Sequence, residues 1–108
     1  MTYTRRLGHV VVPSAVWTSL YVTPAGYTAI IRDVLVVNDA VARPAGQSWL
    51  AYIPAGGGAR LSFIHWPTLP IGTQHYDLRQ ELVAGDTLQA YTSTGPITFA
   101  VTGYVFGV

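Results

Sequence analysis

Cysteine and lysine are both absent from this chain of 108 residues. Without cysteine the chain has no disulfides, no thiol nucleophiles and no thiolate metal ligands, so its stability must come from packing. Without lysine it has neither a Schiff-base lysine nor the lysine of a P-loop, which excludes two common designs of catalytic and phosphate-binding site.

Charge of either sign is also scarce. Charged residues make up 10% of the chain and the net charge is +1, whereas an average soluble domain is about 25% charged. A basic footprint for nucleic acid is therefore missing, and no nucleic-acid partner is predicted. A surface this poor in charge is typical of one covered by copies of itself or by a partner, so we predict a homo-oligomer.

Long hydrophobic runs are missing as well. A membrane-spanning helix needs about 18 or more apolar residues, but the segment 27–37 is interrupted by Arg32-Asp33, so no membrane insertion is predicted. The length fits one domain. We assign residues 1–15 to an N-terminal arm and residues 16–108 to a single domain.

Turn residues recur at short intervals, for example at Thr23–Gly26, Pro54–Gly58 and Ala84–Asp86. The segments between the turns are rich in Val, Ile, Thr, Tyr and Trp, which favour strands. The predicted strands are Val16–Val22, Tyr27–Asn38, Gln47–Ile53, Ala59–Trp66, His75–Val83, Thr87–Ser93 and Ile97–Phe106. This pattern predicts an all-β protein, an antiparallel β-sandwich or jelly-roll-like fold of about seven to eight strands.

Two of these segments leave alternatives open. His75–Val83 alternates between apolar and polar residues as a half-buried strand does, although Leu78 and Leu82 are also spaced for a short helix. In Tyr27–Asn38 the apolar residues change face at Arg32-Asp33. Either a β-bulge lies there, or both faces of the strand are covered.

Catalytic chemistry has little support in the sequence. His75 and Asp77 point the same way on a strand, but no third ligand is apparent, so we predict a solvated face. His65 is expected to be a hydrogen-bonded interior or interface histidine. Asp86 is expected to bond backbone N–H groups of its turn, and Gly56–Gly58 to form a hairpin loop rather than a phosphate cradle. We therefore predict no catalytic residues, no metal site and no cofactor.

The remaining candidates for function are aromatic residues and the arm. Tryptophan and tyrosine can anchor a protein interface or stack against sugar rings. A sugar platform would need two or three rings on one outward face beside polar partners, and Trp17 and Tyr21 are expected to share a face. The predicted partner-contact residues are Tyr3, Arg5, Arg6, Trp17, Tyr21, Trp49 and Trp66.

Three stretches carry a resemblance to a known group. They are a Pro-Ala-Gly turn leading into a long strand that ends in Asn (Val22–Asn38), a Gly-Asp-Thr-Leu turn before a strand (Leu82–Tyr91), and a closing Thr-Gly-Tyr strand (Val101–Tyr104). Together they resemble small tail-associated structural proteins of tailed bacteriophages. The resemblance implies a virion component, with the tail favoured over the head, and carries no catalytic residues across.

The first hypothesis is therefore a non-enzymatic virion structural protein of the tail, near its host-facing end. Its partners would be its own copies, in a homotrimer or homohexamer, and other virion proteins. An alternative is a capsid decoration protein that stabilises the head shell. Another is a carbohydrate-binding or adhesin module, for which a host surface glycan would be the partner. An enzyme would require His65, His75 and Asp77 to converge around a metal.

Overall fold

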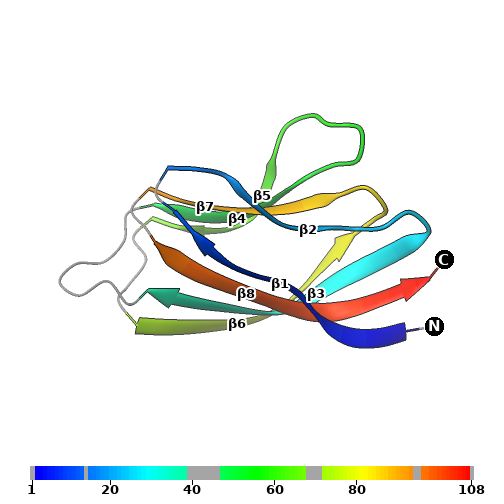
Figure 1. Cartoon of the computed structure of the whole chain (residues 1–108), viewed down its shortest axis with the longest axis horizontal. Helices are drawn as coiled ribbons and strands as arrows, with labels where there is room; N and C mark the ends of the chain where they lie inside the picture. Colours follow the sequence, from blue (N-terminus) through cyan, green and yellow to red (C-terminus); the bar gives the residue numbers. More distant parts are fainter. Residues whose placement is uncertain (1, 14, 39–46, 68–71, 94–95, 108) are drawn as a thin grey trace.

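The chain folds into two four-stranded antiparallel sheets packed face to face, as seen in the computed structural model (Figure 1). The structure describes residues 2–13, 15–38, 47–67, 72–93 and 96–107, and of residues 2–6 only the backbone. The strands are β1 (Thr2–Val12), β2 (Thr18–Val22), β3 (Tyr27–Asn38), β4 (Ser48–Ile53), β5 (Leu61–Trp66), β6 (Gly72–Leu82), β7 (Thr87–Thr92) and β8 (Ile97–Gly107). The all-β prediction is confirmed.

The order of the strands is that of a jelly roll. One sheet runs β1-β8-β3-β6 and the other β2-β7-β4-β5. First and last strands pair with each other, and so do β2 with β7, β3 with β6 and β4 with β5. This nesting arises when one long hairpin is rolled up into two sheets, as in eight-stranded jelly rolls.

The N-terminal segment differs from the expectation. Thr2–Val12, assigned above to an arm outside the domain, form β1 and pair with β8 from Thr2 opposite Phe106 to Val12 opposite Ile97. Leu7 and Val12 are buried in the core. The sandwich therefore begins near residue 2 rather than at residue 16, because this stretch supplies core side chains and covers the open edge of β8.

The core lies between the sheets and follows the alternation of each strand. Along β8, Ile97, Phe99, Val101 and Val105 are buried, while the alternate positions Thr98, Ala100, Thr102 and Tyr104 face outward. The segment after Gly72 is a strand, β6, and not the helix considered as an alternative. From Thr73 to Glu81 exposed positions alternate with half-buried ones, as expected where one face of a sheet is covered.

The predicted β-bulge in β3 is confirmed. Its register shifts between Ile31 and Asp33 against both neighbouring strands, so Arg32 is the extra residue. The bulge lets Ile31 on one side and Val34 on the other both face the core, where each is fully buried. It also turns Asp33 to the outer face of the sheet.

Asp86 forms hydrogen bonds to three turns at one end of the sandwich, which confirms the turn role predicted for it. Its side chain accepts a hydrogen bond from the Val83 N–H at 3.0 Å, within its own turn, and another from the Ala55 N–H at 2.9 Å, in the β4–β5 turn. Its backbone carbonyl accepts from the Thr23 N–H at 3.0 Å. One buried aspartate thus connects three turns, two of which cross between the sheets.

Candidate functional site

A row of four aromatic side chains crosses the outer face of the β2-β7-β4-β5 sheet. Tyr91 on β7 and His65 on β5 lie directly opposite Trp49 on β4, and Trp17 just before β2 completes the row. Neighbouring ring centroids are 5.1 Å apart for Trp17 and Tyr91, 5.4 Å for Tyr91 and Trp49, and 4.7 Å for Trp49 and His65. We call these four residues the aromatic row.

The rings do not form a flat wall. His65 stacks almost parallel on Trp49, at 8°, whereas Trp17 is tilted by 37° to Trp49 and by 39° to Tyr91. Cross-strand aromatic pairs of this kind stabilise a sheet. Here they also leave a shallow depression of about 280 Å³, lined by Trp17, Trp49, Ser62 and Tyr91.

Polar side chains form a second row beside the aromatic row. Gln89 on β7 lies between Ser19 on β2 and Ala51 on β4, and Ala51 lies opposite Ser62 on β5. Gln89 donates to the Ser19 hydroxyl at 3.2 Å and accepts from the Arg60 Nε at 2.8 Å. The Arg60 guanidinium lies 4.3 Å from the centroid of a Trp17 ring. Donors, acceptors and aromatic faces therefore meet on one surface.

Four of the predicted contact residues lie in the domain assigned to residues 16–108. Trp17 and Trp49 come together in the aromatic row, whereas Trp66 and Tyr21 lie elsewhere. Trp66 is 6% exposed and belongs to the core, where its indole Nε1 donates to the Tyr76 hydroxyl at 2.7 Å. Tyr21 is half-buried and packs against the core. The expectation that it shares a face with Trp17 is wrong, because a bulge between Ser19 and Tyr21 reverses the alternation of β2.

The predicted contacts of the arm fall outside what the structure describes. The backbone of Tyr3, Arg5 and Arg6 lies in β1. Their side chains are outside the described residues. Their role as contact residues remains a prediction.

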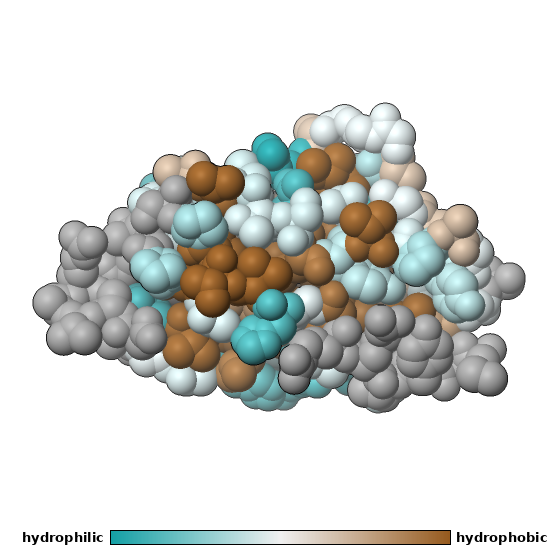
Figure 2. Space-filling model, in the orientation of Figure 1, coloured by the Kyte–Doolittle hydropathy of each residue, from teal (hydrophilic) through white to brown (hydrophobic). Residues whose placement is uncertain are grey.

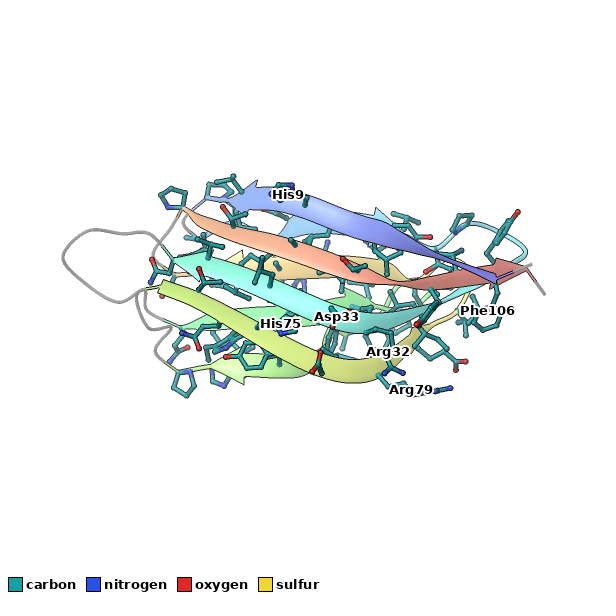
Figure 3. All side chains as sticks on the ribbon, turned by 90° about the horizontal axis from the view of Figure 1, so that it is seen from below. His9, Arg32, Asp33, His75, Arg79 and Phe106 are labelled. Atoms are coloured by element: carbon teal, nitrogen blue, oxygen red, sulfur yellow. The ribbon has the colours of Figure 1, made fainter. Side chains whose placement is uncertain are left out.

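A second cluster lies on the outer face of the opposite sheet. His75 Nε2 is 3.4 Å from Asp33 Oδ1 and 3.7 Å from Asp77 Oδ1, and the three side chains are about half exposed or more. Figure 3 looks onto this face, with Asp33 and His75 side by side on β3 and β6. The three groups offer one nitrogen and two carboxylate oxygens within 4.8 Å of one another, a set that suits a divalent cation completed by water.

Asp33 is the third group of this cluster, and the sequence did not show it. It lies 42 positions before His75 in the chain, and only the pairing of β3 with β6 places it opposite Asp77. His65 is exposed on the other sheet. The set of His65, His75 and Asp77 that an enzyme would have required is therefore not assembled.

Arg32 on β3 and Arg79 and Glu81 on β6 are exposed as well, but the described outward-facing side chains of β1 and β8 carry no formal charge. Five side chains that are neighbours by register form a patch across β1, β8 and β3, which we call the outer patch: Val11, Thr98, Val37, Ala100 and Leu35. Val11 and Leu35 are 59% and 38% exposed. Figure 2 shows the molecule with both sheets edge-on, and there hydrophobic residues gather along the middle of the visible side.

No protein-family model, curated protein or solved structure matches the chain. In the part of the chain that the structure describes, no helix is long and apolar enough to cross a membrane.

Proposed function

We propose that the protein is a non-enzymatic structural component of a phage virion, placed in the tail and assembled by packing of its own copies and of other virion proteins. The outer patch is the observation that carries the proposal. Its five side chains, on β1, β8 and the C-terminal half of β3, can be buried against another subunit without removing charges from water.

Two further features support the proposal. Jelly rolls are a fold that viral shell proteins use, although a fold alone does not define a function. The turn and strand motifs at Val22–Asn38, Leu82–Tyr91 and Val101–Tyr104 resemble those of small phage tail proteins. A decoration protein of the capsid would need the same kind of packing surface and differs from a tail component only in its location.

The test is the solution mass of the purified chain, measured by light scattering after size exclusion. We expect a trimer or hexamer at micromolar concentration, and we expect Leu35→Arg to shift it to a monomer because a guanidinium would be buried at the interface. Leu61→Arg is the matched control, since Leu61 is an exposed leucine on the other sheet, 47% accessible. It should leave the mass unchanged.

A concentration of about 100 µM is far above the Kd of a stable oligomer. If the wild-type chain is still monomeric there, the proposal of self-assembly is wrong. Labelling of intact virions with an antibody against the chain then decides the location. Label on the tail supports the proposal, and label on the head supports the capsid alternative instead.

A further inference from the structure

The aromatic row has features that core packing does not need. Four rings follow one another across all strands of a sheet on its outer side, and the three largest of them are only half-buried. Ser62, Gln89 and Arg60 lie beside them. Rings on one outward face next to polar partners are the arrangement that stacking against a sugar requires.

The chemistry of the polar neighbours indicates what the ligand is. Ser62 and Gln89 are uncharged groups that both donate and accept hydrogen bonds, and Arg60 adds a planar set of donors. The aromatic row and these three neighbours contain no carboxylate. Such a site matches a ligand with one apolar face and a rim of hydroxyl groups that accept and donate, which is the chemistry of a neutral pyranose.

Size separates a sugar from a protein partner. The depression is a shallow cup of about 280 Å³ lined by four residues, whereas a stable protein interface takes about 20 or more residues on each side. A cup of this size accommodates a small ring with its substituents. The contact of Arg60 with both Gln89 and Trp17 holds the polar side of the cup in place before any ligand arrives, which lowers the entropic cost of binding.

We propose that the outer face of the β2-β7-β4-β5 sheet is a carbohydrate-binding site. A neutral pyranose lies in the depression with its apolar face stacked on one of the rings of Trp17, Tyr91 and Trp49 and its edge against the others, while its hydroxyl groups bond to Ser62, Gln89 and Arg60. The site lies on the sheet opposite the outer patch. The proposal therefore does not depend on the proposed assembly, and the two can fail separately.

The experiment begins with a printed array of neutral saccharides, followed by calorimetric titration of the full chain with the sugars that bind. The probes are glucose, galactose, mannose, rhamnose and N-acetylglucosamine, as free sugars and as short oligomers. We expect at least one to bind with a Kd of about 1 mM or tighter, in the range where a few stacking and hydrogen-bond contacts place a small ligand. Binding should also change the fluorescence of Trp17 and Trp49, which lie on the surface, unlike Trp66.

Variants locate the site. Tyr91→Ala and Trp17→Ala should each weaken binding at least tenfold, and Gln89→Ala should weaken it with little effect on folding because it leaves every ring in place. Tyr104→Ala is the matched control, as Tyr104 is an exposed tyrosine on the other sheet, 40% accessible. Thermal unfolding of each variant shows whether it is folded before binding is measured.

Two results would overturn the proposal. The first is the absence of binding to every saccharide by a folded chain. The second is binding that survives Tyr91→Ala and Gln89→Ala. If the wild type binds no saccharide and the same variants lose binding to a protein partner, the aromatic row is a protein interface instead. The solution mass should be the same in these variants as in the wild type, which separates this test from that of the outer patch.

Discussion

Asp33 on β3 and Asp77 on β6 are direct cross-strand partners, with the His75 Nε2 3.4 Å from one carboxylate and 3.7 Å from the other. Like charges directly opposite each other destabilise a sheet. We expect Asp77→Asn to raise the free energy of unfolding by a few tenths of a kcal/mol, about the scale of exposed charge pairs. The gain should shrink in high salt, because salt screens exposed charges.

Thermal melts at low and high ionic strength check this prediction, with Glu81→Gln on the same strand as the control. A rise in the melting temperature of the wild type on adding zinc, absent from Asp77→Asn, would show instead that the two carboxylates share a cation. A lower stability of Asp77→Asn without metal would contradict the prediction.

Asp86 should matter more to stability than any exposed aspartate. Its carboxylate accepts from the N–H groups of Ala55 and Val83, so removing it leaves two part-buried donors without this partner. We expect Asp86→Ala to lower the free energy of unfolding by about 2–4 kcal/mol and Asp86→Asn by about half as much, since the amide keeps one acceptor. Urea unfolding measures both, and near-wild-type stability of Asp86→Ala would refute the role described for this residue.

Gly103 lies where the backbones of β8 and β3 come close together. A Cβ atom at this position would clash with the backbone carbonyl oxygen of Ile30, which cannot move aside as a side chain can. We expect Gly103→Ala to destabilise the fold by about 2 kcal/mol or more. Gly107→Ala on the same strand is the control, because its Cβ would meet only the Tyr27 ring at 4.0 Å. Equal melting temperatures for the two variants would contradict this prediction.

The hydrogen bond from Trp66 to Tyr76 joins the two sheets, since Trp66 is on β5 and Tyr76 on β6. Tyr76→Phe would leave the indole N–H in the core without this acceptor, at a cost of about 1–3 kcal/mol. In a double-mutant cycle with Trp66→Phe we expect a coupling energy of about 1 kcal/mol. A coupling energy near zero would mean that the bond contributes nothing to the packing of the sheets.

Much of the fold was predictable because short strands and turn residues are local signals. All seven predicted segments contain strands, and the bulge near Arg32 could be read from the change of face between Ile31 and Val34. The β1 strand was missed because its partner, β8, lies at the other end of the chain. Arg5-Arg6 and Gly8 also interrupt its apolar pattern.

The sites were less predictable, because both depend on which strands are neighbours. Trp49, Tyr91 and His65 form one row only through the order β7-β4-β5, and Asp33 reaches His75 only through the pairing of β3 with β6. Neither relationship has a signature in a single sequence. The inward position of Trp66 follows from alternation with His65, but alternation alone does not say which of the two faces the core.

The nesting of the strand pairs has a consequence for the speed of folding. Among the strands that the structure describes, only β4 and β5 are paired neighbours joined by a short turn, while the β1–β8 pair must bring Thr2 to Phe106. Closing such a long loop costs entropy before its contacts form, so this topology folds slowly. If the two ends of the chain were joined and the chain reopened at Gly56–Gly58, β1 and β8 would become the local hairpin. The native contacts would be the same, but they would form in a different order.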